Sequence, residues 1–148
     1  MRLFVVSIAF FVQTLAAQPA RQVPIPPIQN DRFVRDLREK NIDDLLHLYT
    51  PRATFVDPDG HEFLGYDQLR RRFQQMSPAS DRALHLETTS IKRTYTAVIE
   101  HGRFTETVRN PTTGATKEFR GSYVFLHEKQ PNGDWLIAHQ RWAGNPLR

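Results

Sequence analysis

The sequence predicts an α+β fold in which helices come first and an antiparallel sheet follows. Apolar residues recur at helical spacing between residues 30 and 76. Between residues 83 and 142 the chain is instead rich in Thr, Val, Ile, Tyr, Phe and Trp, which favour strands. Turn signals at residues 110–114 and 131–134 divide this second part into hairpins. Helices followed by a strand meander indicate one α+β domain, and 148 residues are enough for a sizeable core.

Three helices are expected before the sheet. The first begins near Asn30, a residue type that caps helices, and the second begins at Asn41 and ends before Pro51. The third is opened by Gly65 and runs from about residue 66 to residue 76. Each has an apolar stripe three or four residues apart: Phe33, Val34 and Leu37; then Ile42, Leu45, Leu46 and Tyr49; then Leu69, Phe73 and Met76.

The strands follow from β-branched and aromatic composition. A short strand at residues 53–56 leads into an acidic turn at residues 57–60. The meander is expected at residues 83–93, 95–109, 116–128 and 134–142. Its strongest turn signal is the Asn132-Gly133 pair between the last two strands.

The first 17 residues predict a secretory signal peptide. Arg2 precedes an apolar run at residues 3–12, and small residues follow at 16–17. That run is shorter than the roughly 20 apolar residues of a membrane span, so we expect no stable membrane anchor. A proline-rich linker (18–29) and the folded domain (30–148) follow. We expect a secreted or periplasmic protein whose N-terminal sequence starts near Gln18; the alternatives are an uncleaved anchor or a buried N-terminal helix.

Composition argues against several classes of function. The chain has no cysteine, which excludes disulfides and a thiol nucleophile. Its net charge of +4 is spread along the chain, and the one dense basic run, at residues 70–72, points to different sides of a helix. Histidine spacing matches no common metal motif, and there is no phosphate-binding or dinucleotide-binding glycine pattern. We therefore predict no nucleic-acid partner, no metal and no cofactor.

Residues 45–65, LLHLYTPRATFVDPDGHEFLG, resemble the entry to the nuclear transport factor 2-like superfamily. The tail NGDWLI at residues 132–137 is similar to the last strand of that superfamily. The superfamily includes ketosteroid isomerase and the SnoaL-like cyclases, and the resemblance covers residues 31–142. It implies a cone-shaped fold, also called cystatin-like, in which a curved antiparallel sheet wraps around the N-terminal helices and encloses a pocket. Because this fold hosts many activities, it does not name a substrate.

Asp57 is the catalytic candidate that the resemblance suggests most directly. In ketosteroid isomerases an aspartate in a similar Asp-Pro-x-Gly turn is the general base. The alternative is that Asp57 only holds the turn through local backbone hydrogen bonds. The oxyanion donors of the isomerase are missing, because Phe33 replaces a tyrosine and Gly121 stands nearest to a protonated aspartate. Their absence argues against a steroid isomerase.

Strand alternation and the resemblance together place His139 and Arg141 inside the cone with Trp135 and Ile137. His139 then acts as an acid or base near neutral pH, and Arg141 holds a carboxylate or enolate. The alternative is a core-bonded histidine and an arginine paired with the acidic turn. Tyr123 either donates to a ligand or packs with its hydroxyl satisfied. The predicted site comprises catalytic Asp57 and His139, with ligand-binding Phe33, Tyr49, Phe55, Tyr123, Phe125, Trp135 and Arg141.

These residues predict a pocket for a small, mostly apolar or carboxylated molecule. Such a site is also compatible with catalysis of cofactor-free proton transfer, of the isomerase or lyase type. The rival hypothesis is a non-catalytic interaction or assembly module whose cone is filled by side chains. An open cavity favours the first hypothesis, and a packed interior favours the second.

The outer face of the last two strands predicts a homodimer. Strand alternation places on this face Ser122, Val124, Leu126, Leu136, Ala138, Gln140 and Trp142. An exposed apolar row of this kind marks an interface, and two-fold pairing is the commonest assembly. The competing explanation is that the faces are reversed, which would bury this row and expose His139 and Arg141.

Overall fold

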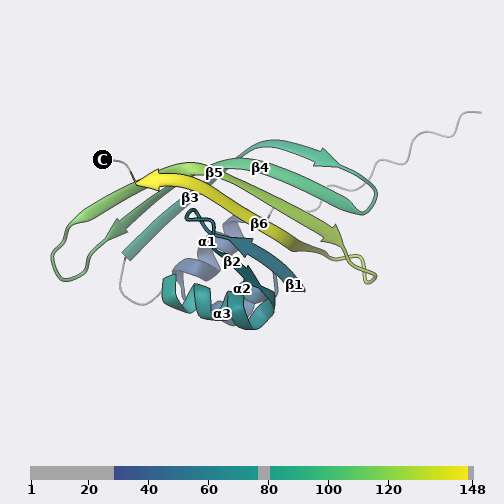
Figure 1. Cartoon of the computed structure of the whole chain (residues 1–148), viewed down its shortest axis with the longest axis horizontal. Coiled ribbons are helices and arrows are strands. Elements are labelled where there is room, and N and C mark those ends of the chain that lie inside the picture. The colour runs from purple at the N-terminus through teal and green to yellow at the C-terminus, as the bar shows by residue number, and fades with distance from the viewer. Residues whose placement is uncertain (1–28, 77–80, 147–148) are drawn as a thin grey trace, which may run out of the picture.

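The structure is a computed structural model that describes residues 29–76 and 81–146 (Figure 1). The elements are α1 (Asn30–Arg38), α2 (Ile42–Leu46), β1 (Tyr49–Val56), β2 (Glu62–Leu64), α3 (Gly65–Met76), β3 (Asp81–Arg93), β4 (Ala97–Arg109), β5 (Thr116–Lys129) and β6 (Trp135–Pro146). Figure 1 shows the long strands arching over the three helices, which lie together beneath one face of the sheet. The α+β prediction is therefore confirmed.

One six-stranded sheet takes the order β2-β1-β6-β5-β4-β3. Neighbouring strands pair antiparallel, except that β1 and β6 are parallel. The hairpin turns predicted at residues 110–114 and 131–134 are confirmed, and Gly114 and Gly133 take positive φ values of 70° and 95° there. The long strands from β3 to β6 form the curved wall, and the helices supply the opposite side of the core.

An aromatic core joins the helices to the concave face of the sheet. The ring of Phe33 on α1 lies 6.0 Å from that of Phe125 on β5 and 6.2 Å from that of Trp142 on β6. Phe73 on α3 meets Phe55 on β1 edge-on at 5.5 Å. All five side chains are almost fully buried, so burial of aromatic surface fastens both helices to the sheet.

The second helix is shorter than expected, because Tyr49 begins β1 and α2 ends at Leu46. Tyr49 pairs with Ile137 of β6 and is fully buried. Its spacing from the apolar residues before it therefore indicated correctly that it is buried, but not that it is helical. Pro51 lies within β1, where the pairing with β6 shifts register between Tyr49 and Thr54. A proline fits such an irregularity because no ladder hydrogen bond is needed from its nitrogen. The short strand β2 was not predicted.

Asn30 is the first residue of α1 and not its cap. Gln29 is the N-cap and makes no side-chain capping hydrogen bond. The Asn30 amide instead donates to Glu100 at 2.8 Å and to the Tyr123 hydroxyl at 3.0 Å. The expected cap residue therefore fastens the start of α1 to the sheet.

A bulge in β6 interrupts the alternation of its side chains. Leu126 of β5 pairs with His139, whereas the next residue, His127, pairs with Ile137. Ala138 is therefore an extra residue without a partner across the ladder. Such a bulge shifts the two-residue period by one, so every later side chain of β6 changes face.

The faces predicted for β6 are therefore wrong beyond residue 138. Gln140 and Trp142, expected on the outside, are 0% and 7% exposed. His139 and Arg141, expected inside the cone, lie on the outer face, where Arg141 pairs with Val124. The prediction assumed regular two-residue alternation along the strand, and the extra residue Ala138 breaks that alternation.

The predicted signal peptide at residues 1–17 and the linker at residues 18–29 lie outside the described residues, apart from residue 29. Export and the domain boundaries therefore stay predictions. Within the described part of the chain, no helix has the length and apolar character needed to cross a membrane.

Candidate ligand pocket

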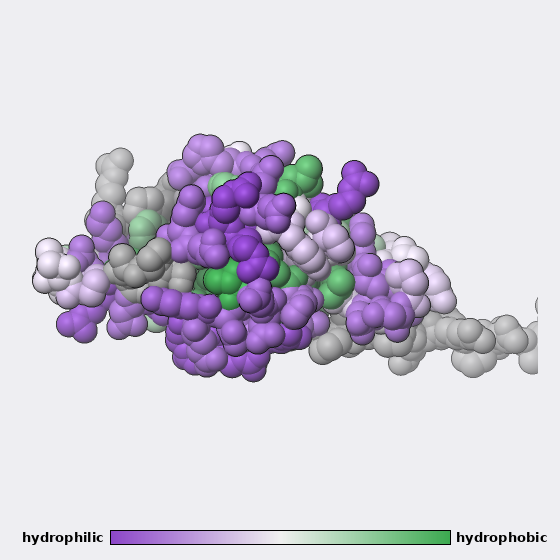
Figure 2. All heavy atoms as spheres, turned by 90° about the horizontal axis from the view of Figure 1, so that it is seen from below, coloured by the Kyte–Doolittle hydropathy of each residue, from purple (hydrophilic) through white to green (hydrophobic). Residues whose placement is uncertain are grey.

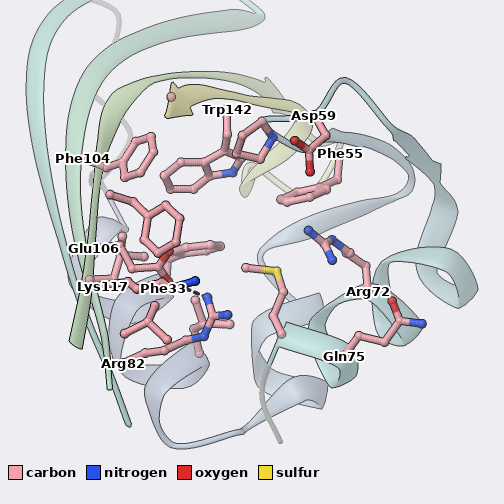
Figure 3. A pocket seen from close by; sticks show the side chains of 17 residues that line it. Phe33, Phe55, Asp59, Arg72, Gln75, Arg82, Phe104, Glu106, Lys117 and Trp142 are labelled. Carbon is pink, nitrogen blue, oxygen red and sulfur yellow. Dashed lines mark hydrogen bonds and ion pairs between the residues drawn. The ribbon is translucent and has the colours of Figure 1, made fainter. Parts of the chain in front are cut away.

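A cavity of about 360 Å³ lies between α1, α3, the turn after β1 and the concave face of the sheet. Its apolar wall includes Phe33, Leu37, Phe55, Met76, Leu84, Phe104, Val108, Phe119 and Trp142. Its polar lining consists of Asp59, Arg72, Gln75, Arg82, Glu106 and Lys117. Figure 2 shows a hydrophobic patch framed by hydrophilic side chains on the side of the molecule that carries α3, and Figure 3 shows the lining residues from close by.

The aromatic wall rests on two glycines that face each other across β5 and β6. Gly121 pairs with Gly144, and Phe104 of β4 lies against both. A Cβ atom on Gly121 would meet the Phe104 ring at 2.7 Å, and one on Gly144 would meet it at 2.9 Å. Trp142 packs edge-on to Phe104 at 4.9 Å. The missing side chains thus leave room for the ring and deepen the concave face.

Asp57 holds its turn and positions Arg72. Its Oδ1 accepts hydrogen bonds from the backbone N–H groups of Asp59 and His61, both at 3.0 Å. Its Oδ2 lies 3.2 Å from Nη2 of Arg72 on α3. Asp57 is 3% exposed and does not line the cavity. This geometry favours the turn-holding alternative for Asp57 over a base that faces a ligand.

Two hydrogen-bond donors of the cavity wall have no partner. Among the described residues, the buried side-chain atoms without a hydrogen bond include Arg72 Nε and Trp142 Nε1. Both residues line the cavity, and Figure 3 shows Arg72 projecting into it from α3, with the indole of Trp142 across from it. An unpaired buried donor costs about 1–3 kcal/mol, so each is a place where an acceptor would be stabilised.

The charged rim contains both signs. Arg82 Nη1 lies 2.6 Å from Glu106 Oε1, which pairs these neighbours on β3 and β4. The Asp59 carboxylate and the Lys117 ammonium have no hydrogen bond or ion pair with another described residue. A ligand at the mouth of the cavity therefore meets one free anion and one free cation.

A buried polar network lies outside this cavity. Glu100 of β4 is 1% exposed and accepts hydrogen bonds from Asn30, Thr88, Tyr123 and His127 at 2.7–3.1 Å. Burial would raise the pKa of Glu100, but these hydrogen bonds outweigh it and lower the pKa. Burial, opposed by the hydrogen bond with Thr88 and reinforced by Glu100, raises the pKa of Tyr123 to about 12. The network joins α1 to three strands.

The predicted site residues divide into three groups. Phe33 and Phe55 line the cavity. The core contains Tyr49, Tyr123, Phe125 and Trp135, which do not line it. His139 and Arg141 lie on the outer face of the sheet. The structure thus brings together only part of the predicted ligand-binding set, and it separates the two predicted catalytic residues, Asp57 and His139.

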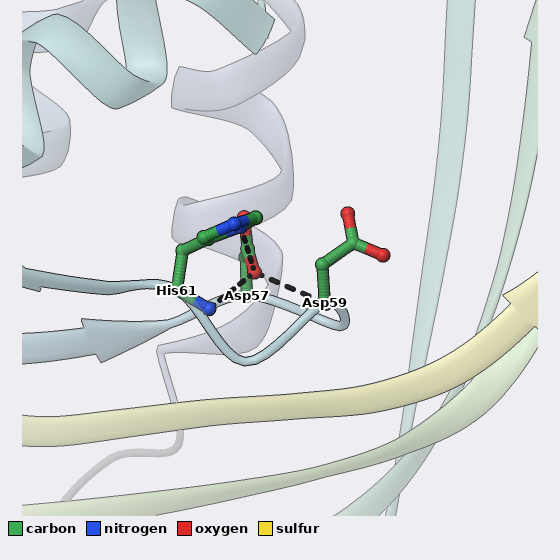
Figure 4. A group of neighbouring side chains, drawn as sticks. All are labelled: Asp57, Asp59 and His61. Atoms are coloured by element: carbon green, nitrogen blue, oxygen red, sulfur yellow. Dashed lines mark hydrogen bonds and ion pairs between the residues drawn. The ribbon is translucent and has the colours of Figure 1, made fainter.

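Asp57, Asp59 and His61 form a compact group around the turn (Figure 4). One ligand atom from each lies within 4.8 Å of the others. Oδ1 of Asp57 accepts two backbone hydrogen bonds, and Oδ2 contacts the His61 ring and forms an ion pair with Arg72. The grouping is therefore explained by the turn itself.

The curved sheet, the helices beneath it and the cavity between them define a class of small pocket-forming α+β proteins. The chain belongs to the SnoaL-like domain family, whose model matches residues 30–144. The predicted resemblance to the nuclear transport factor 2-like superfamily is confirmed. A search of curated proteins finds no match.

Solved structures show the same fold at low sequence identity. A conserved protein from Planctomyces limnophilus is 17% identical, with a TM-score of 0.73 and coverage of 79% of this chain and 91% of that one. A nuclear transport factor 2-like superfamily protein from Salmonella enterica serovar Typhimurium is 21% identical, with a TM-score of 0.69 and coverage of 77% and 84%. A hexachlorocyclohexane dehydrochlorinase is 11% identical, with a TM-score of 0.71 and coverage of 82% and 86%. These likenesses support the fold alone.

Sequence reasoning missed the residues that give the cavity its polar character. Arg72 belongs to the basic run at residues 70–72, which was interpreted as a solvated helix face. It follows Leu69 by three residues and precedes Phe73 by one, so it borders the buried stripe of α3. Trp142 was assigned to the wrong face because the bulge at Ala138 leaves no sequence signal.

Proposed function

We propose that the chain binds a small, mostly apolar molecule in the cavity beneath the sheet. The observation that carries this proposal is an apolar cavity of about 360 Å³ whose wall contains two unpaired buried donors. Small-molecule sites have roughly 300–1,000 Å³ and combine apolar walls with a few polar groups. The cavity supports ligand binding over the alternative of an interaction module with a filled cone.

Proton transfer is a second candidate function, favoured by Asp59. Its carboxylate lines the cavity and is exposed, whereas the carboxylate of Asp57 is engaged by the turn and by Arg72. A carboxylate beside a bound carbon acid can act as a general base without a cofactor. The test is turnover of a molecule that co-purifies with the protein: loss of turnover in Asp59→Asn, with ligand binding retained, supports this role, and unchanged turnover excludes it.

Binding is tested with a neutral fluorescent probe, N-phenyl-1-naphthylamine. The wild-type protein is expected to enhance its fluorescence saturably. Val108→Trp places an indole in the cavity wall and is expected to weaken binding about tenfold or more, because the volume for the probe is lost. The matched control is Thr107→Trp, which alters the neighbouring residue on the opposite face of β4.

Equal binding by both tryptophan variants would show that the probe binds outside this cavity and would contradict the proposal.

If only Val108→Trp loses binding, mass spectrometry of small molecules that co-purify with the wild type, compared with those of Val108→Trp, identifies the natural ligand.

We also propose two-fold pairing through the outer sheet face, with a corrected set of residues. Ile99 is 37% exposed and pairs with Leu126, and Val124 lies beside them on the same face. Trp142 is core and does not belong to this patch. Light scattering is expected to show a dimer that Ile99→Glu plus Leu126→Glu converts to a folded monomer; a monomeric wild type would rule the pairing out.

A further inference from the structure

We infer that the cavity selects an acid, and that Arg72 and Trp142 together bind its carboxylate while the aromatic wall holds an apolar, ring-sized body. This inference rests on the proposed function and deepens it by naming the class of ligand. The two buried polar atoms of the cavity wall that lack partners are both N–H donors. A carboxylate has two oxygens and accepts two such bonds.

Trp142 contributes a donor that nothing else uses. Its side chain is 7% exposed, so it is more than nine-tenths buried, and its Nε1–H has no acceptor among the described residues. Buried tryptophans usually have a hydrogen-bond partner for this group. Figure 3 shows the indole of Trp142 across the cavity from Arg72, which projects from α3.

Arg72 is held in place before any ligand arrives. Asp57 Oδ2 lies 3.2 Å from Nη2, and the ring of Phe63 lies under the guanidinium at 5.4 Å. These contacts engage one edge and one face of the guanidinium and leave Nε without a partner. Preorganisation of this kind lowers the entropy lost when a carboxylate binds. Asp57 is thus a positioning residue for Arg72.

Water does not reach either nitrogen in this structure, so a ligand must move a side chain to reach them. Met76 belongs to the same wall and is unbranched, which makes it the side chain best able to shift. The exclusion of water increases affinity for a carboxylate, because a charge-assisted hydrogen bond is stronger in a low-dielectric site than at the surface.

The two unpaired charges of the rim act on an acid in opposite directions. Lys117 is a cation and Asp59 an anion, and neither has a partner among the described residues. An acid that enters the cavity is attracted by Lys117 and repelled by Asp59. Removing the Asp59 charge is therefore expected to tighten binding of an acid and to leave a neutral molecule of the same shape unaffected.

The test compares naphthalene-2-carboxylate with naphthalene-2-carboxamide on the purified protein, each displacing N-phenyl-1-naphthylamine. The acid is expected to bind about tenfold or more tightly than the amide, the factor that a hydrogen bond to a charged group typically supplies. Arg72→Met is expected to abolish this preference, and Arg71→Met, which changes an exposed neighbour on α3, to keep it. Asp59→Asn is expected to increase affinity for the acid severalfold and leave the amide unchanged.

Arg72→Met leaves the buried Asp57 carboxylate without its cation, so the double variant Asp57→Asn/Arg72→Met serves if the single variant does not fold. Trp142→Phe removes the second donor and is expected to weaken only the acid. If acid and amide bind the wild type equally, the inference is overturned and the proposed apolar pocket stands. If neither compound displaces the probe, the inference is overturned, and the apolar pocket is then judged by the probe and the Val108→Trp variant alone.

Discussion

Gly121→Ala is expected to lower the free energy of unfolding by about 3 kcal/mol, the upper part of the range for overpacking a filled site. A Cβ atom at residue 121 would lie 2.0 Å from the carbonyl oxygen of Ala143 and 2.7 Å from the ring of Phe104. The first of these is backbone in the neighbouring strand β6, which cannot move aside without disturbing the ladder. Urea denaturation monitored by circular dichroism measures the change.

The matched control is Ser122→Ala, one residue along β5 and exposed on the opposite face. Its effect is expected to stay within about 0.5 kcal/mol, as for most surface substitutions. Wild-type stability in Gly121→Ala would mean that β5 and β6 do not approach as their register places them. The same variant is also expected to lose probe binding, because any movement of Phe104 enters the cavity.

Gly121 also explains why this chain lacks the oxyanion-binding aspartate of ketosteroid isomerases. In their pattern the position nearest to Gly121 carries a protonated aspartate that donates to the oxyanion. Here no side chain fits, because Gly144 and Phe104 already occupy the space above the strand. The space that an acid would fill becomes part of an aromatic wall. The unpaired buried donors of this cavity lie elsewhere, on Arg72 of α3 and Trp142 of β6.

Much of the fold follows from local patterns that the structure preserves. The stripe of α3 buries Leu69 and Phe73, and the turn glycines Gly114 and Gly133 adopt the positive φ that their turns require. These predictions work because each depends on neighbours within a few residues. Tyr49 shows where such reasoning fails, since its spacing fits a buried helix and a buried strand equally well.

The site could be predicted only in part, because its geometry depends on contacts distant in sequence. The extra residue Ala138 moves His139 and Arg141 outward and brings Trp142 inward, and nothing in the local sequence marks it. The role of Asp57 is set by Arg72, fifteen positions later on another element. Phe33, which the resemblance matched to a tyrosine of the isomerase site, and Phe55 both line the cavity.

Glu100→Leu is expected to lower the free energy of unfolding by about 3–5 kcal/mol, the range for removing one partner of a buried ionic contact. The carboxylate accepts from Asn30, Thr88, Tyr123 and His127, and leucine would leave these four buried or half-buried groups without their acceptor. Since Asn30 begins α1, the helix is expected to loosen from the sheet. Glu128→Leu, at an exposed position of β5, is the control and is expected to change little.

The charge of Glu100 also makes stability depend on pH in the acidic range. Its pKa in the folded protein is lowered from the ordinary value of 4.5, because the four hydrogen bonds outweigh burial. The folded state therefore binds this proton less readily than the unfolded state, and the stabilisation is present above the unfolded pKa and lost as pH falls through the folded pKa. Thermal unfolding of the wild type is expected to lose melting temperature as the pH falls below about 5, and Glu100→Gln to lose less over the same range. Parallel curves for the two proteins would show that Glu100 is not ionised in the folded state, and that its neighbours are held by neutral hydrogen bonds alone.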